Sequence, residues 1–286
     1  MNSHSIIIPA KNEEAGLDLI LPRLKQLFPD TDILVINDCS TDNTLKITQT
    51  HGARVISHPY SMGNGAAIKT GARAAKGQIL IFMDADGQHD PNDIPRLLQK
   101  LNDGYDMVIG ARDSESPSSV GRWYANKFYS RLASWMVGQP ILDLTSGFRA
   151  VRAEKFREFL HLLPNGFSYP TTITMSFFRS GYTVSYLPIR AELRHGKSHI
   201  RLFKDGLRFL IIIFRIGTLY SPLKIFLPFS LVFFLTGLGY YVYTFTTTGR
   251  FTNMSGLLFT TSVLVFLIGL VSEQITNLLY SRGNQN

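Results

Sequence analysis

The sequence of 286 residues contains a single cysteine, Cys39. One cysteine cannot close an internal disulfide bond, so the chain is not a disulfide-stapled scaffold, and its composition fits a reducing compartment. No secretory signal peptide is expected, because the apolar run at residues 5–9 is much shorter than the apolar region of such a peptide. The sequence also contains no internal repeat and no Walker-type phosphate loop. What remains is a non-repetitive chain long enough for one or two domains with a real core.

Acidic residues are almost absent from the last third of the chain, where only Asp205 and Glu273 follow Glu192. Within this part, residues 225–246 and 251–272 carry no charge, and each stretch is long enough to span a bilayer. The segment before them mixes basic residues with Phe, Leu and Ile, which is typical of a helix in the membrane interface. An amphipathic helix docked on a soluble domain is the alternative interpretation of that segment.

Basic residues flank the two uncharged stretches on both outer sides, and only Arg250 lies between them. The positive-inside rule therefore places both ends of the chain in the cytoplasm, together with the domain that precedes the stretches. We expect a cytoplasmic domain at residues 1–198, interfacial helices at 199–224, a transmembrane hairpin at 225–280 and a cytoplasmic tail at 281–286.

The net charge of +8 and the isoelectric point near 9.6 indicate an anionic partner. The positive charge concentrates beside the uncharged stretches, where anionic lipid attracts it, so we expect no nucleic-acid partner. The anionic partners that remain are a membrane surface and a phosphorylated substrate.

Short apolar runs alternate with helical patterns through the first part of the chain. This alternation predicts an α/β domain of three layers around a largely parallel sheet. The expected strands cover residues 5–8, 33–36, 54–57, 79–83, 107–111 and 183–188, and the clearest helices cover 11–27, 43–51, 91–101, 121–137 and 168–179.

The stretch around which the domain is organised begins with the buried strand at residues 79–83. Asp84, Asp86 and Gln88 follow that strand immediately. Ligands of open α/β sheets bind outside the carboxyl ends of the strands. Carboxylate and amide oxygens suit Mg²⁺ or Mn²⁺, which usually also bind substrate phosphates. The alternative is a solvated turn with an Asx cap before the next helix.

A glycine-rich segment, residues 62–77, reads as a helix with small residues. Close packing of this helix against the sheet is at least as good an explanation as the cradling of a phosphate.

Arginines supply candidate anion-binding groups, because a guanidinium matches phosphate geometry in bidentate fashion. The candidates are Arg112, Arg122, Arg149 and Arg194. For Arg122 and Arg149, an exposed ion pair on the surface is an equally good interpretation.

Taken together, the ordered segments resemble the motifs of glycosyltransferase family 2. They are SIIIPAKNEE, VINDCSTDNT, MDADGQHDP, GAR and TSGFRA. The later segment RHGKSH, followed by two spans, is similar to the polyprenyl-phosphate glycosyltransferases, the class that contains dolichol-phosphate mannose synthase and bacterial undecaprenyl-phosphate sugar transferases. The resemblance implies a GT-A fold, which is Rossmann-like with a mostly parallel sheet, followed by interfacial amphipathic helices and the two-helix transmembrane hairpin.

The resemblance also implies roles for residues at the matching positions. Asp86, Arg112 and Arg122 would be catalytic. The metal would bind to Asp84, Asp86 and Gln88, and the acceptor phosphate to Arg112, Arg122 and Asn126. The nucleotide sugar would contact Pro9, Ala10, Glu13, Ile36, Asp38, Asp84, Ala85, Arg194 and Lys197. The chain departs from the family at Asn37 and at Thr171–Thr172, where acids are usual, and at His199, where a lysine is common.

The function that this resemblance implies is inverting transfer of one hexose from UDP- or GDP-hexose to a polyprenyl phosphate, with Mg²⁺ or Mn²⁺. The protein would be an enzyme of the cytoplasmic membrane and could form a homo-oligomer. A lipid phosphate is already an oxyanion, so no general base is needed. The identity of the sugar and of the base stays open.

Two other functions compete with this interpretation. A processive polysaccharide synthase would carry a QxxRW segment and more spans, and the sequence has neither. A catalytically silent membrane scaffold would have no reason to retain Asp84, Asp86, Arg112 and Asp38 together.

Overall fold

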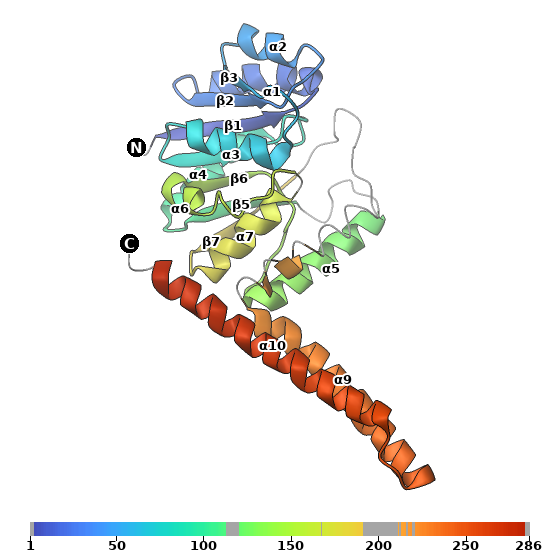
Figure 1. The fold of residues 1–286 in the computed structure, drawn as a ribbon. Coiled ribbons are helices and arrows are strands. Elements are labelled where there is room, and N and C mark those ends of the chain that lie inside the picture. Colours follow the sequence, from blue (N-terminus) through green and yellow to red (C-terminus); the bar gives the residue numbers. More distant parts are fainter. Residues whose placement is uncertain are drawn as a thin grey trace. The chain divides into compact units, whose positions relative to one another are not determined.

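The computed structural model describes residues 3–112, 120–166, 168–190, 211, 213–215, 217–218 and 221–283, with the backbone alone at 120–126, 277 and 279–283. The chain forms two compact units, Met1–Ile212 and Ile213–Asn286. In the first unit, strands and helices alternate along the chain (Figure 1). Its elements are β1 (His4–Ala10), α1 (Glu14–Leu27), β2 (Asp32–Asn37), α2 (Thr44–Thr50), β3 (Arg54–Ser57), α3 (Asn64–Ala74), β4 (Ile79–Phe82), η1 (Pro91–Asp93), α4 (Ile94–Asn102), β5 (Met107–Arg112), α5 (Val120–Val137), β6 (Arg149–Arg152), α6 (Ala153–Glu158), α7 (Tyr169–Arg179) and β7 (Val184–Ile189).

The strands form one seven-stranded sheet in the order β3-β2-β1-β4-β6-β5-β7. All neighbouring strands are parallel except where β6 pairs antiparallel with β4 and with β5. The predicted α/β class with a mostly parallel sheet is confirmed, and the turn before Arg149 leads into β6, which α6 follows directly. Because β6 runs in the opposite direction, its first residue lies at the edge where β4 and β5 end.

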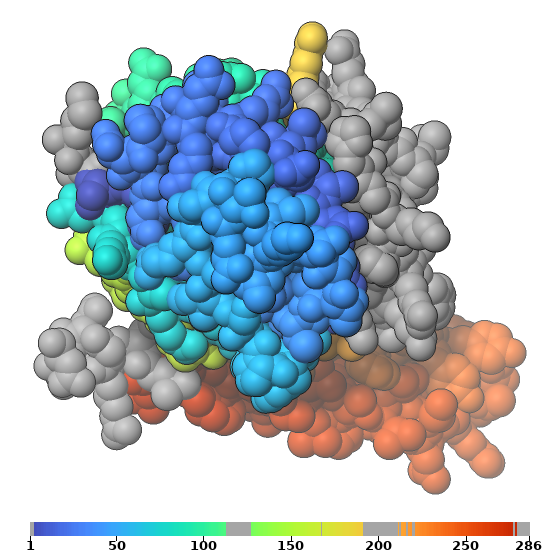
Figure 2. Space-filling model, turned by 90° about the horizontal axis from the view of Figure 1, so that it is seen from above, coloured from blue at the N-terminus to red at the C-terminus, as the bar shows by residue number. Residues whose placement is uncertain are grey.

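The sheet is covered on both faces, since side chains of successive strand residues point to opposite sides. Ile6 and Ile8 of β1 join the core formed with α1 and α4. Ile7 joins the other core, formed with α3, α6 and α7. Figure 1 shows α3 and α7 on the same side of the sheet, and Figure 2 shows the amino-terminal residues, in blue, as one closely packed face.

The glycines of the segment 62–77 allow close approach of α3. A Cβ on Gly71 would lie 2.3 Å from Cγ2 of Ile7, and one on Gly65 would lie 1.9 Å from the carbonyl oxygen of Pro164. Neither position has room for a side chain. The interpretation of these glycines as a close-packing surface is therefore confirmed.

The second unit is a hairpin of α9 (Pro222–Thr248) and α10 (Asn253–Gly283), which contain the two predicted spans. Both helices are long and apolar enough to cross a membrane, with mean hydropathy of 1.8 and 2.2. Small residues join them: the hydroxyls of Ser230 and Ser262 each donate to the other residue's carbonyl oxygen, at 2.9 Å in both cases. Such contacts are typical of helices that pack in a bilayer.

Candidate active site

The carboxyl ends of β1, β2, β4 and β5 lie at one edge of the sheet, and the antiparallel β6 adds its amino-terminal end to them. In register, Phe82 of β4 pairs with Arg149 of β6, which in turn pairs with Ile109 of β5. Asp84 follows β4, Arg112 ends β5, and the segment 143–148 leads into β6. The topology therefore brings three distant parts of the sequence to one place.

Asp84 lies directly against the backbone of the segment before β6. A Cβ on Gly147 would lie 2.7 Å from Oδ2 of Asp84, so any other residue there would push against the carboxylate. The carbonyl oxygen of Gly147 accepts a hydrogen bond from the Tyr169 hydroxyl at 3.1 Å. This bond links residues 143–148 to the first turn of α7. The start of β6, the first turn of α7 and Asp84 therefore hold fixed positions relative to one another.

Asp86 is buried and shapes its own loop. The backbone NH of Gln88 donates to Oδ1 of Asp86 at 3.2 Å, and the ring of His89 stacks on Phe148 with centroids 4.9 Å apart. Burial lowers the pKa of His89 to about 4, so its ring is neutral near pH 7. The neutral Nδ1 can accept the backbone NH of Asp84 at 3.3 Å. An Asx-type turn is thus present, and Asp90 caps the next helix by accepting from the backbone NH of Asn92 at 3.0 Å, as the alternative interpretation predicts, but Asp86 is 7% exposed rather than solvated.

A divalent cation fits this donor set only in part. Asp84 and Asp86 supply hard oxygen atoms, and no group of three or more His, Cys, Asp or Glu side chains able to hold a metal occurs among the described residues. Mg²⁺ and Mn²⁺ are commonly bound by one or two carboxylates, with substrate phosphates completing their coordination. The residues present therefore fit a cation that arrives with a phosphorylated substrate.

Arg112 is held by a carboxylate that sequence reasoning missed. Its Nε and Nη2 donate to the two carboxylate oxygens of Asp143 at 2.8 and 3.0 Å, and Nη2 also bonds to Thr145. Burial opposes ionisation of Asp143, but the Arg112 guanidinium outweighs it and keeps the pKa of this carboxyl below its ordinary value. Asp143 lies two residues before the TSGFRA motif, which is the signal that could have found it.

Arg149 is neither an anion clamp nor a surface ion pair. Its side chain is 0% exposed, and its guanidinium donates to Oγ1 of Thr174 at 3.1 Å and to the carbonyl oxygens of Pro170 and Ser146. It also lies 5.6 Å from the centroid of the Tyr169 ring. Both interpretations offered for Arg149 are therefore wrong, because β6 carries this residue into the core behind α7.

Asp38 organises the loop between β3 and α3. Its carboxylate accepts from Nδ1 of His58 (2.8 Å), the Ser61 hydroxyl (2.8 Å) and the backbone NH groups of Met62 (2.7 Å) and Gly63 (2.9 Å). Burial opposes its ionisation, but these bonds outweigh burial and hold the pKa of Asp38 below its ordinary value. A carboxylate has about four acceptor positions. A nucleoside that bound to Asp38 would have to replace one of these partners, so its binding role stays a prediction.

The other residues predicted for the nucleotide sugar lie at the same edge. Pro9 and Glu13 are partly exposed, whereas the Ala10 and Ala85 side chains are buried and Ile36 belongs to the core next to α3. Their contacts with a nucleotide stay predictions.

Side-chain positions are not described for the four remaining predicted residues. Arg122 and Asn126 lie in α5, where the structure gives their backbone alone. Arg194 and Lys197 lie outside the described residues, as does most of the predicted interfacial segment 199–224.

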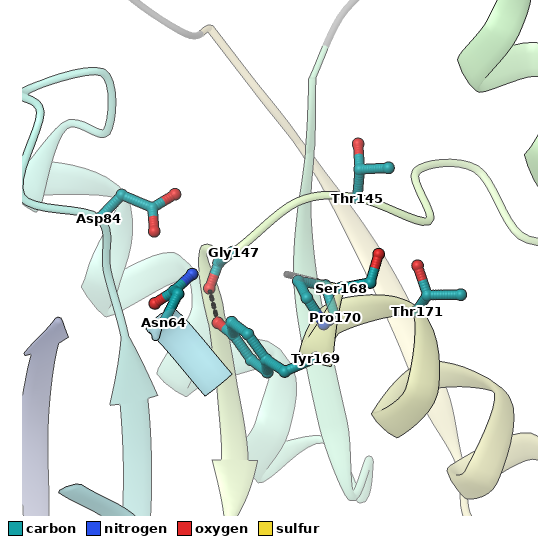
Figure 3. A pocket seen from close by; sticks show the side chains of 8 residues that line it. All are labelled: Asn64, Asp84, Thr145, Gly147, Ser168, Tyr169, Pro170 and Thr171. Atoms are coloured by element: carbon teal, nitrogen blue, oxygen red, sulfur yellow. Dashed lines mark hydrogen bonds between the residues drawn. The ribbon is translucent and has the colours of Figure 1, made fainter. Parts of the chain in front are cut away.

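A cavity of about 80 Å³ opens beside Asp84 (Figure 3). The first turn of α7 forms one wall, and the segment before β6 and the start of α3 contribute the rest. Its lining residues are Asn64, Asp84, Thr145, Gly147, Ser168, Tyr169, Pro170 and Thr171. Of these residues, the sequence predicts a role only for Asp84, and Thr171 stands out only as a departure from the family. The others are ordinary turn and helix-start residues, and only the fold brings them together.

This architecture is that of an α/β enzyme domain, with acidic residues and a cavity at the carboxyl edge of its sheet, joined to an apolar helical hairpin. Residues 5–160 match glycosyl transferase family 2, and residues 221–278 match the GtrB C-terminal hairpin. The chain belongs to glycosyltransferase family 2. It is a glycosyltransferase whose C-terminal hairpin has two helices long and apolar enough to cross a membrane.

Curated relatives agree with this assignment. The chain is 32% identical over 201 residues to undecaprenyl-phosphate mannosyltransferase of Micrococcus luteus, covering 64% of this chain and 81% of the relative. It is 28% identical over 204 residues to dolichyl-phosphate hexose transferase of Haloferax volcanii, covering 71% and 88%. With glycosyltransferase AglJ of Haloferax volcanii it shares 27% identity over 289 residues, covering 96% and 93%.

Solved structures confirm the fold. Glucosyl-3-phosphoglycerate synthase of Mycobacterium tuberculosis, solved with Mn²⁺, UDP and glucosyl-3-phosphoglycerate, superposes with a TM-score of 0.63 at 21% identity, covering 76% of this chain and 80% of that chain. The predicted GT-A fold is therefore confirmed.

Proposed function

We propose that this protein transfers one hexose from a nucleotide-diphosphate sugar to a polyprenyl phosphate, with inversion, at the cytoplasmic face of a membrane. The observation that carries the proposal is the placement of Asp84, Asp86 and Arg112 at one sheet edge in a chain that also has an apolar hairpin. The names of the relatives support the acceptor, since undecaprenyl and dolichyl phosphates are both polyprenyl phosphates.

Asp84 and Asp86 would hold a Mg²⁺ or Mn²⁺ ion against the donor diphosphate. When bound, such an ion stabilises the negative charge that develops on a departing diphosphate. The described lining of the cavity offers Asp84 as its only carboxylate, so no separate general base is available there. None is required if the acceptor is a phosphate, because its oxygen is already anionic near neutral pH.

Arg112 would orient the acceptor phosphate from the end of β5. Asp143 fixes the guanidinium by two hydrogen bonds, which leaves the remaining N–H donors in a set direction. Positioning of the two reactants would then be the main contribution of this side of the site.

The proposal is tested by transfer from labelled UDP-glucose, UDP-galactose, GDP-mannose and GDP-glucose to undecaprenyl and dolichyl phosphate in detergent. We expect a lipid-soluble product from one of these donors, and we expect EDTA to abolish its formation and Mn²⁺ or Mg²⁺ to restore it. Asp86→Asn should lower the rate by at least about a hundredfold, because an oxygen ligand that stabilises leaving-group charge is lost.

The matched control is Asp103→Asn, which removes an exposed carboxylate at the end of α4 and should leave the rate unchanged. Transfer that is insensitive to EDTA and to Asp86→Asn would contradict the metal-dependent mechanism. A chain that neither transfers sugar nor binds any of the four donors in calorimetry would contradict the proposal as a whole.

A further inference from the structure

Two buried hydroxyls in the wall of the cavity lack a hydrogen-bond partner among the described residues. They are Oγ of Ser168 and Oγ1 of Thr171, whose residues are 3% and 0% exposed. Both residues line the cavity beside Asp84, and Figure 3 shows their hydroxyls rising from the first turn of α7 on the side where Thr145 lies. Buried polar groups are nearly always paired, so an unpaired pair in the wall of a cavity points to a ligand.

Ser168 is the N-cap residue of α7, but its hydroxyl does not cap the helix. A serine that precedes a helix usually accepts a hydrogen bond from a backbone NH of the first turn. Ser168 makes no such bond, and its backbone is left-handed, with φ 85° and ψ 23°. Non-glycine residues in this region are strained, and such strain is concentrated at functional positions. Ser168 therefore combines a strained backbone with an unpaired hydroxyl in the wall of the cavity.

Thr171 differs from the neighbouring Thr172 in the hydrogen bonding of its hydroxyl. The hydroxyl of Thr172 lies 3.4 Å from the carbonyl oxygen of Ser168, one helical turn earlier, which is a common arrangement for a helical threonine. Thr171 makes no such bond among the described residues, so its hydroxyl is left unpaired in the wall of the cavity.

The chemistry of the lining selects a neutral polyhydroxylated ligand. Asn64, Thr145, Ser168 and Thr171 offer uncharged donors and acceptors, and Asp84 is the only charged side chain among the described residues of the lining. The proposed cation at Asp84 would balance the donor diphosphate, whereas the rest of the described lining has no charged side chain to pair with a further anionic group such as a sugar carboxylate. The volume of about 80 Å³ exceeds by several times the roughly 10–15 Å³ that one water needs.

We infer that this cavity receives the ring of the donor hexose, and that the hydroxyls of Ser168 and Thr171 bind sugar hydroxyls and help to determine which hexose is transferred. The inference rests on the proposed function, because it takes the donor to be a nucleotide sugar whose diphosphate lies at Asp84 and Asp86. It adds that the transferred sugar is a neutral hexose rather than a uronic acid.

The test compares Thr171→Val and Ser168→Ala with Ser176→Ala in the full chain. Valine has nearly the shape of threonine without its hydroxyl. Ser176 is a matched control, because its hydroxyl is also buried and without a partner among the described residues of α7 but does not line the cavity. The readout is kcat/KM for the best donor of the four nucleotide sugars and for the same nucleotide carrying an epimeric hexose.

We expect Thr171→Val to lower kcat/KM for the best donor about tenfold, as the loss of one hydrogen bond allows. The ratio between that donor and its epimer should fall as well, because a site that no longer bonds the sugar hydroxyl discriminates less. Ser168→Ala should act in the same direction, Ser176→Ala should leave both quantities within twofold, and UDP-glucuronic acid should not be transferred by the wild type.

Calorimetry with the product nucleotide, UDP or GDP, separates loss of sugar contacts from loss of structure. Thr171→Val should bind the product nucleotide as the wild type does and the intact nucleotide sugar more weakly. If the wild type transfers sugar but Thr171→Val and Ser168→Ala keep its kcat/KM ratio between the best donor and the epimer, the hydroxyls hold water only, and the inference is overturned while the proposed function stands. A wild type that transfers no sugar overturns both.

Discussion

At the scale of single residues, the site depends on buried carboxylates that accept hydrogen bonds from protein groups instead of from water. Asp38 holds the loop before α3, and Asp143 holds Arg112. In both cases burial raises the cost of the charge, and hydrogen bonds from the protein outweigh it, so the pKa lies below the ordinary value. Each carboxylate therefore links folding to pH through its ionised form.

The Asp143–Arg112 pair makes a testable contribution to stability. A lowered pKa in the folded state stabilises the protein above the ordinary carboxyl pKa of 3.8, and this contribution disappears as the pH falls through the lower folded value. We expect Asp143→Asn to reduce the free energy of unfolding near pH 7 by about 2 kcal/mol. This is less than the loss for a fully buried pair, because Arg112 is partly exposed and screened by solvent.

The measurement is urea unfolding of the full chain in detergent, followed by tryptophan fluorescence at several pH values. The difference between wild type and Asp143→Asn should shrink as the pH falls below 3.8. The variant Asp30→Asn removes an exposed carboxylate and should leave the unfolding free energy within about 0.5 kcal/mol of the wild type. A difference that stays constant into the acid range would show that the Asp143 charge is not the cause.

At the scale of elements, the direction of β6 determines what meets at the site. Its antiparallel course puts Gly147 beside Asp84 and Asp143 beside Arg112. Arg149 then fastens this segment to α7 from behind through the carbonyl oxygen of Pro170. The first turn of α7, beside which the cavity hydroxyls lie, is thereby fixed relative to the loop that carries Asp84.

The hairpin is held by small residues at the contact between α9 and α10. A Cβ on Gly269 would lie 2.7 Å from Cβ of Phe226, whereas one on Gly239 would meet nothing within 4 Å. We expect Gly269→Val to separate the helices and to lower the thermal midpoint of the hairpin in detergent, and Gly239→Val to leave it nearly unchanged. Both variants add the same side chain to an apolar helix.

Disulfide cross-linking measures how closely α9 and α10 pack. The variant carries Ser230→Cys and Ser262→Cys, and Cys39→Ser removes the native cysteine from the reaction. The parent serine hydroxyls lie 3.2 Å apart, so the introduced pair should oxidise readily. Gly269→Val should reduce the yield of this disulfide, and Gly239→Val should not. Equal yields in both variants would contradict the role of Gly269 in the contact.

At the scale of the whole molecule, the chain joins an enzymatic α/β unit to an apolar hairpin. The positive-inside rule predicts that the α/β unit and both termini are cytoplasmic and that the connection around Arg250 faces the other side. This orientation belongs to the proposed function, because the charge of a nucleotide sugar opposes passage through a bilayer, so the α/β unit must lie on the side where the donor is present.

The native cysteine offers an internal reporter of orientation. Cys39 is exposed in the α/β unit, and it is the only cysteine of the chain. We expect a membrane-impermeant maleimide to label Arg250→Cys in intact cells, and to label Cys39 only after the cells are permeabilised. Labelling of Cys39 in intact cells without labelling at position 250 would reverse the predicted orientation.

Much of this organisation follows from the sequence alone. All strands of the sheet except β6, most of the helices, the acidic loop after β4 and the two apolar helices were predicted, because periodicity, turn residues and charge are local properties. The ordered motifs also predicted the family, which the comparisons confirm. Local pattern thus determined which elements exist and in what order they follow one another.

The tertiary structure decided which residues meet. Asp143 lies 31 positions from Arg112, and Arg149 lies 25 positions from Thr174, so no local pattern predicts either contact. The burial of Arg149 and the unpaired hydroxyls of Ser168 and Thr171 likewise depend on the antiparallel course of β6 and on the packing of α7. Pairing and burial are properties of the folded chain, because they depend on segments that only the sheet brings together.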